Sequence, residues 1–198
     1  HTKVFQDERE RPVLVVLDAS PSLFFGTRRR LKSVAAGQMA AAIAWAAVRR
    51  GDRIGGFLFA PGRHRELRPA GGRRGAMRMI QGLVEWLQPG QSSDLDGEPL
   101  SAALERVRHT VRPGSLVIVI SDFFNVDELC SRHLSRLRQH NDVIGCQVLD
   151  VAEQRLPEGR YPITDGHDSS ILNMASGEAR SRYEAMVAGH MTEPRRLF

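Results

Sequence analysis

The chain has 198 residues, of which 41% are hydrophobic and 26% are charged, and its formal net charge is +5 at pH 7. This length suits one α/β domain with a full core and leaves little room for two complete domains. The positive charge comes almost entirely from arginine, and without a nucleic-acid motif it favours a solvated surface over a nucleic-acid site. We expect a single domain over residues 1–198, and the abrupt start at His1 suggests a fragment of a longer protein.

The chain contains two cysteines, Cys130 and Cys146, without the spacing of a redox motif or a zinc site. This usage fits a reducing compartment, and Cys146 lies in an apolar run where we expect it to be buried. No stretch reaches the roughly eighteen apolar residues of a membrane span, and the first residues lack a signal-peptide pattern. We therefore expect a soluble, cytoplasmic fragment, although the full-length protein could be membrane-anchored.

The first predicted element is a strand over Val13–Leu17, an apolar run without a polar face that stops at Asp18. Such a run is typical of a strand buried on both sides, and ligands bind at the carboxyl ends of strands in open α/β sheets. Asp18, Ser20 and Ser22 offer a carboxylate and two hydroxyls, a set of oxygen ligands that suits Mg²⁺ or Mn²⁺. Alternatively, these side chains only bond to backbone amides of the local turn.

Three arginines, residues 28–30, come next and should lie exposed near the same edge of the sheet. They are either a solvated turn or a surface that attracts an acidic partner. Further along the chain, residues 71–75 are glycine-rich but lack the Gly-Lys-Ser of a phosphate-binding loop, so we predict a linker there. His133 and His140 lack further metal ligands around them, which favours surface histidines.

A second buried strand, residues 115–122, ends in Ser-Asp. The carboxyl ends of parallel strands meet at one edge of a sheet, so Asp122 should lie near Asp18, and two strand-end aspartates strengthen the case for a site. Alternation of apolar strands and helices predicts an α/β fold with a mainly parallel sheet, the Val13 strand at its centre and helices on both faces. The other predicted elements are helices over about 31–50, 76–87, 100–111, 127–139 and 177–191, strands over 52–60, 63–68 (a polar edge strand) and 142–150, and an added edge hairpin within 157–173.

The segment Lys3–Thr27 closely resembles the bacterial family called domain of unknown function fifty-eight, a branch of the von Willebrand factor A-like proteins. The resemblance implies a Rossmann-like three-layer sandwich with an antiparallel edge strand. It also implies that Asp18, Ser20 and Ser22 form the first part of a metal-ion-dependent adhesion site, and that Asp122 matches the late aspartate of that site. A further implication is a partner of the MoxR-type ATPase chaperone class, with a role in assembling or activating other proteins.

One position departs from the family pattern. The superfamily's loop threonine, which supplies another metal ligand, corresponds to Glu98 in this chain. Glu98 could ligate through its carboxylate, Asp94 or Asp96 could compensate, or the site could have decayed. We expect metal ligands at Asp18, Ser20, Ser22, Glu98 and Asp122.

Three functions follow from these patterns. The first is a protein-interaction module that uses Mg²⁺ or Mn²⁺ and has no catalytic activity. The second is a Mg²⁺-dependent phosphatase or phosphotransferase with Asp18 as the nucleophile. Against the second, Ser20 stands where haloacid-dehalogenase-type enzymes place another aspartate, and neither Lys3 nor Lys32 is expected at a later strand end. The third is a scaffold that has lost its metal.

Overall fold

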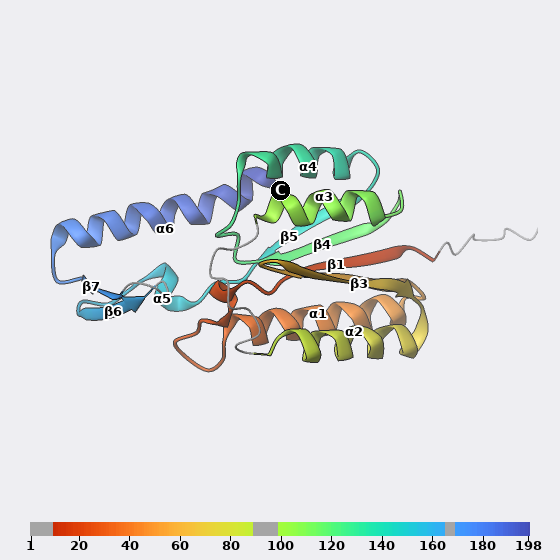
Figure 1. Cartoon of the computed structure of the whole chain (residues 1–198), viewed down its shortest axis with the longest axis horizontal. Coiled ribbons are helices and arrows are strands. Elements are labelled where there is room, and N and C mark those ends of the chain that lie inside the picture. The colour runs from red at the N-terminus through yellow and green to blue at the C-terminus, as the bar shows by residue number, and fades with distance from the viewer. Residues whose placement is uncertain (1–9, 89–98, 165–168) are drawn as a thin grey trace, which may run out of the picture.

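The computed structural model describes residues 10–88, 99–164 and 169–198, and its centre is a five-stranded sheet (Figure 1). The strand order is β3-β2-β1-β4-β5; β1 pairs in parallel with both β2 and β4, β4 pairs in parallel with β5, and β3 runs antiparallel to β2. The predicted central position of the Val13 strand and the antiparallel edge strand are therefore confirmed. The strands are β1 (Pro12–Asp18), β2 (Arg53–Ala60), β3 (Arg63–Ala70), β4 (Leu116–Ser121) and β5 (Asp142–Gln147).

Helices cover both faces of this sheet, which confirms the three-layer sandwich (Figure 1). α1 (Lys32–Arg49) and α2 (Gly72–Trp86) lie on one face, and α3 (Leu100–Thr110) and α4 (Glu128–Arg138) lie on the other. Alternate β1 side chains point to opposite layers, so Val15 packs on the α1 side and Val16 on the α3 side. After its first turn, which buries Lys32 and Ser33, the buried face of α1 consists of alanines, which lets this helix lie close to the sheet: Ala36, Ala40, Ala44 and Ala47.

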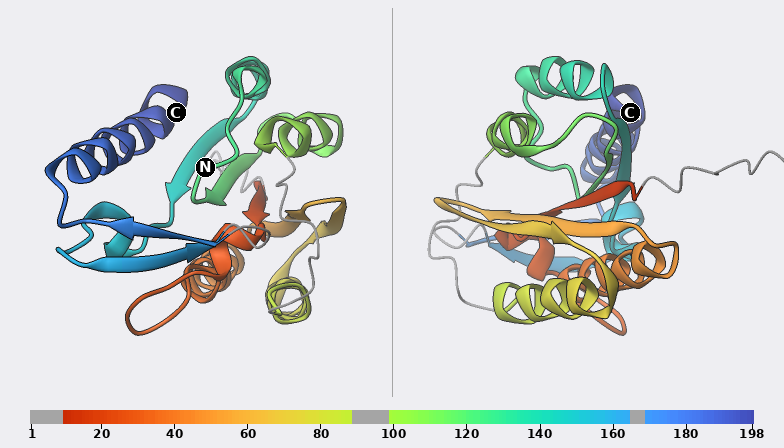
Figure 2. Two further views of the ribbon diagram at one scale, coloured as in Figure 1. Left: turned by 60° about the vertical axis from the view of Figure 1, so that its left-hand side comes forward. Right: turned by 90° about the vertical axis from the view of Figure 1, so that its right-hand side faces the viewer.

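The last part of the chain extends away from the central sheet. The short helix α5 (Val151–Gln154) follows the carboxyl end of β5, as the short η1 (Pro21–Phe24) follows that of β1. The last helix, α6 (Gly177–Leu197), ends beside α4. β6 (Arg160–Thr164) and β7 (Ser169–Asn173) form a two-stranded antiparallel sheet of their own, set apart from the larger one (Figure 2). The hairpin was predicted correctly, but its expected position at the edge of the main sheet was wrong.

Four local predictions also need correction. Helix α2 begins at Gly72, inside the predicted linker, and Gly75 in its first turn packs so closely on the carbonyl of Ala70 that a Cβ would not fit there. His133 is buried, since it lies on the same face of α4 as Cys130 and Leu137, three residues before and four residues after it. Cys146 is only half-buried, because β5 is an edge strand. Helix α6 continues to Leu197, beyond the predicted end at residue 191.

Candidate metal-binding site

The two strand-end aspartates lie together, as expected, at the carboxyl edge of the sheet. Asp18 ends β1, and Asp122 follows the last residue of the adjacent strand β4. The Ser121 hydroxyl donates a hydrogen bond to Asp18 Oδ2 at 2.6 Å, and the Ser20 amide donates to Asp18 Oδ1 at 2.8 Å. Asp18 is 2% exposed and Asp122 is fully buried. The sheet therefore holds two carboxylates side by side, away from bulk water.

The two serine hydroxyls of the loop have no hydrogen-bond partner among the described residues. Both Ser20 Oγ and Ser22 Oγ are buried, and Ser20 does not use its hydroxyl to cap η1. The alternative of local turn bonding therefore holds for Asp18, which accepts from the Ser20 amide. The Ser20 hydroxyl lies close enough to Asp18 to help lower the pKa of that carboxyl, but it does not meet the geometry of a hydrogen bond, and the Ser22 hydroxyl has no such neighbour within the described ranges. Buried polar groups without partners are costly and uncommon in native proteins, so each needs an explanation. A hard cation with oxygen ligands supplies one, and these residues fit such an ion.

The electrostatics of the edge favour a cation as well. Burial, and then the negative charge of Asp122, raise the pKa of Asp18 to about 6, although hydrogen bonds from Ser121 and Ser20 oppose the shift. The ionised form of Asp18 therefore lacks sufficient compensation from the protein itself. A divalent ion between the carboxylates would remove that repulsion.

The backbone directly after Asp122 adopts an uncommon conformation. Phe123 has φ of 59°, and within the described ranges no other residue except glycine has a positive φ. Its ring is buried and contacts Phe198 edge-on at a centroid distance of 5.5 Å, while its amide donates to Ser121 Oγ at 2.9 Å. Conformations of this kind occur often at functional sites, where the surrounding structure holds them in place.

Lys32 is the residue that the sequence reasoning missed. Its ammonium lies 2.9 Å from Asp122 Oδ2 and 2.5 Å from Glu153 Oε1, and its side chain is 2% exposed. The expectation that neither lysine reaches a strand end was wrong, because the long side chain extends from the first turn of α1 to β4. The sequence did contain a signal, since Lys32 and Lys3 are the only lysines in an arginine-rich chain.

The lysine also connects the site to α5 and α6. Glu153 and Asp150 form a capping box at the start of α5, and Asp150 accepts hydrogen bonds from the amide and hydroxyl of Thr27 in the loop before α1. The Lys32 ammonium lies 5.1 Å from the centre of the Phe124 ring, which stacks on His190 of α6 at 3.9 Å. The site edge is therefore held by segments far apart in the sequence.

The remaining predicted residues have different outcomes. Glu98, Asp94 and Asp96 lie outside the described residues, so the role of Glu98 as a ligand stays a prediction. Residues 28–30 are exposed in the loop between η1 and α1, as expected. The described part of the chain contains no cluster of three His, Cys, Asp or Glu side chains suited to a metal ion, so any site here depends on the serines. No helix in the same ranges is both long enough and apolar enough to cross a membrane.

Comparison with solved structures supports the fold. The chain is similar to an aerotolerance-related membrane protein from Bacteroides fragilis (TM-score 0.59, 17% identity, covering 90% of this chain and 88% of that one). It is equally similar to the conserved hypothetical protein BatB from Bacteroides thetaiotaomicron (TM-score 0.59, 15% identity, covering 89% and 86%). These neighbours are von Willebrand factor A-like, and so is the fold of this chain.

Sequence relatives extend the comparison to mycobacteria. Proteins described as uncharacterized, Rv1480 of Mycobacterium tuberculosis and Mb1516 of Mycobacterium bovis, are 27% identical over 195 residues, which is 98% of this chain. The chain spans 60% of the length of these relatives. The model of the family described as "Protein of unknown function DUF58" matches residues 1–193, and the chain therefore belongs to that family.

Proposed function

We propose that the chain is a protein-interaction module whose binding depends on a Mg²⁺ or Mn²⁺ ion. The Ser20 and Ser22 hydroxyls hold the ion, and Asp18 and Asp122 hold it directly or through water. An acidic side chain of the partner completes the coordination. The observation that carries this proposal is the pair of buried, unpartnered serine hydroxyls beside two buried carboxylates.

The proposed partner is a MoxR-type ATPase, and the proposed role is to assemble or activate other proteins. The family resemblance suggests this partner, and the exposed arginines at residues 28–30 supply basic side chains in the loop between η1 and α1, which follows Ser22. Charges at the rim of an interface mainly raise association rates. We place the activity in the cytoplasm, because Cys130 and Cys146 are both free thiols.

Metal titration tests the proposal directly. Calorimetry with Mg²⁺ and Mn²⁺ should show one site in the wild type, and the double variant Ser20→Ala/Ser22→Ala should lose it. Ser135→Ala, which removes an exposed serine hydroxyl of α4, is the matched control. Equal metal affinity in the double variant and the control would contradict the proposal.

One observation favours an alternative, a Mg²⁺-dependent phosphatase or phosphotransferase with Asp18 as the nucleophile. Lys32 supplies a cation beside Asp122, a feature that the sequence had appeared to lack. Against this alternative, both Asp18 oxygens accept hydrogen bonds and the side chain is buried. Mg²⁺-dependent hydrolysis of a generic phosphate ester that disappears in Asp18→Asn would favour the enzyme over the interaction module.

A further inference from the structure

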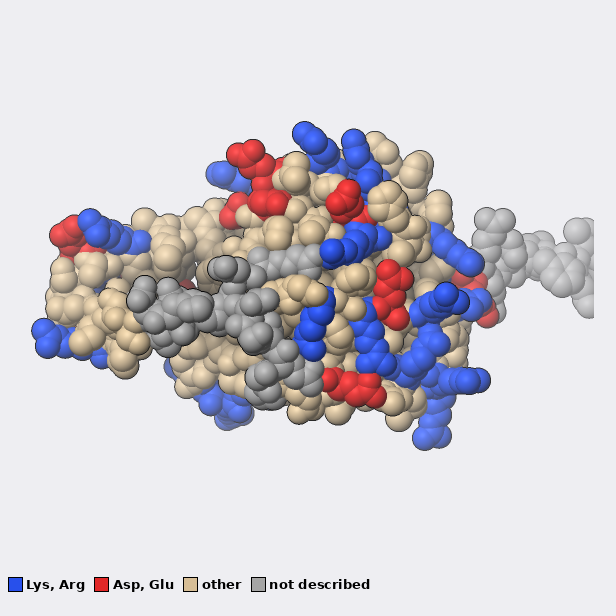
Figure 3. Space-filling view, viewed as in Figure 1, with Lys and Arg blue, Asp and Glu red and all other residues tan. Residues whose placement is uncertain are grey.

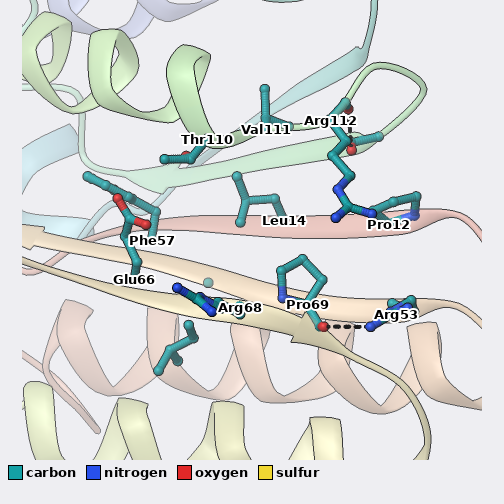
Figure 4. A pocket seen from close by; sticks show the side chains of 13 residues that line it. Pro12, Leu14, Arg53, Phe57, Glu66, Arg68, Pro69, Thr110, Val111 and Arg112 are labelled. Atoms are coloured by element: carbon teal, nitrogen blue, oxygen red, sulfur yellow. Dashed lines mark hydrogen bonds between the residues drawn. The ribbon is translucent and has the colours of Figure 1, made fainter.

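A second candidate site lies at the other end of the sheet. It is a cavity of about 470 Å³ on the α3 side, over the first residues of β1 and β2 and over β3 (Figure 4). α3 and α4 leave this part of the sheet open. Leu14 at the cavity is four residues before Asp18, and a strand rises about 3.3 Å per residue, so the cavity is on the order of 13 Å from the candidate metal site.

Three arginines from separate elements converge on the cavity: Arg53 of β2, Arg68 of β3, and Arg112 after α3. Arg53 donates to the Pro69 carbonyl at 3.2 Å, which fixes its position. The Arg68 and Arg112 guanidinium groups make no hydrogen bond or ion pair within the described ranges. Basic side chains also predominate on the right-hand part of this face in the space-filling view (Figure 3). The cavity therefore offers unpaired donors to an anion.

The polarity of the cavity changes along its length. Arg53 and Arg112 lie at one end, Arg68 lies between, and Glu66 lies with Phe57 at the other end (Figure 4). The Glu66 carboxylate also lacks a partner among the described residues. The floor on the α3 side is formed by Leu14 and Phe57, while the Leu67 side chain points to α2 on the opposite face. Further apolar residues line the cavity: Pro12, Pro69 and Val111. A ligand that matches this pattern has an anionic group at one end, an apolar body, and a hydrogen-bond donor at the other end.

We infer that this cavity binds a nucleotide, that is, a small phosphorylated molecule with a planar heteroaromatic ring system. The phosphates lie against the arginines, because guanidinium groups bind phosphate with paired, charge-assisted hydrogen bonds. The ring lies on the apolar floor, and Glu66 accepts a hydrogen bond from an amino group of the base or a sugar hydroxyl. The volume is within the range of small-molecule pockets, roughly 300–1,000 Å³. The presence of one carboxylate among the arginines disfavours a polyanion that carries charge along its whole length.

The test measures binding of ADP by calorimetry in EDTA, with inorganic pyrophosphate and adenosine as the two halves of the molecule. ADP should bind at least about tenfold more tightly than either half, because the cavity contacts both ends of the nucleotide. Arg68→Gln/Arg112→Gln should weaken ADP binding by about tenfold or more. Arg73→Gln/Arg74→Gln removes the same charge from exposed positions on α2, on the opposite face, and should leave the affinity nearly unchanged.

Several outcomes would overturn the inference. Pyrophosphate binding as tightly as ADP would mean that only charge is recognised. Equal effects of the two double arginine substitutions on ADP affinity would mean that the excess charge of the whole chain attracts the anion. Displacement of ADP by a single-stranded oligonucleotide more strongly than by pyrophosphate or adenosine would indicate a site for a polymer. The Ser20→Ala/Ser22→Ala variant should bind ADP like the wild type, and loss of binding there would place the ligand at the metal site instead.

Discussion

The substitution Asp18→Asn isolates the energetic cost of burying a carboxylate at this edge of the sheet. Burial and the charge of Asp122 raise the pKa of Asp18 from 3.8 to about 6. The folded state holds the Asp18 proton more tightly than the unfolded state does. The contribution of this group to the unfolding free energy is therefore largest below pH 3.8 and is lost as the pH rises through 6. The Asp18→Asn variant has no charge to bury at this position, so its unfolding free energy should not fall in this way as the pH rises.

The expected magnitude follows from the size of the shift. Between about pH 4 and about pH 7.5, the wild type should lose about 2 kcal/mol of unfolding free energy relative to Asp18→Asn. The asparagine oxygen can still accept from the Ser20 amide, and its NH₂ group can donate to Ser121 Oγ. Any cost of that rearrangement is the same at both pH values, so it cancels from the comparison.

Urea denaturation in EDTA measures this difference at the two pH values. Glu184→Gln, which removes an exposed carboxylate of α6, is the control for charge alone. With Mg²⁺ at about a hundred times its Kd, the wild type should gain about 2.7 kcal/mol near pH 7.5 and Asp18→Asn should gain little. An unfolding free-energy difference between wild type and Asp18→Asn that stays constant across the pH range would refute the reasoning about burial.

Three further predictions concern Lys32, Glu98 and the arginines at residues 28–30. Lys32→Met should destabilise the metal-free protein by about 3 kcal/mol, because it leaves Asp122 and Glu153 without their cation, and Mg²⁺ should recover part of that loss in thermal unfolding. Glu98→Thr should lower calorimetric Mg²⁺ affinity and increase metal-dependent capture of a MoxR-type ATPase, and identical values in both proteins would contradict a ligand role for Glu98. Charge reversal of residues 28–30 should slow partner association and reduce its salt dependence in surface plasmon resonance, and an unchanged association rate would exclude them from the interface.

The central position of the first strand and the position of the aspartates could be predicted from the sequence, because both follow from local pattern. Val13–Leu17 is apolar on both faces, which only a central strand requires, and Asp18 ends that run. Lys32 could not be found in this way, since its partners are distant in the sequence and a helical lysine is usually exposed. The burial of His133 depends on which face of α4 meets α3 and the sheet, and that too is set by tertiary packing.

The balance of charge around Asp122 explains how a lysine and a metal ion can belong to the same site. Three carboxylates and one ammonium meet there, because Lys32 pairs with Asp122 and Glu153 while Asp18 lies beside Asp122. These four groups carry two excess negative charges when fully ionised, and Asp150, which interacts with Lys32, adds a third, so one divalent ion offsets two of the three. Lys32 alone leaves Asp18 uncompensated, and this agrees with the raised pKa of that carboxyl. A metal ion must displace the proton of Asp18 below about pH 6, so Mg²⁺ affinity should fall by up to about tenfold for each further pH unit. Calorimetric titrations across that range test the balance, and a Mg²⁺ affinity that is constant down to about pH 5 would show that Asp18 does not take part in holding the ion.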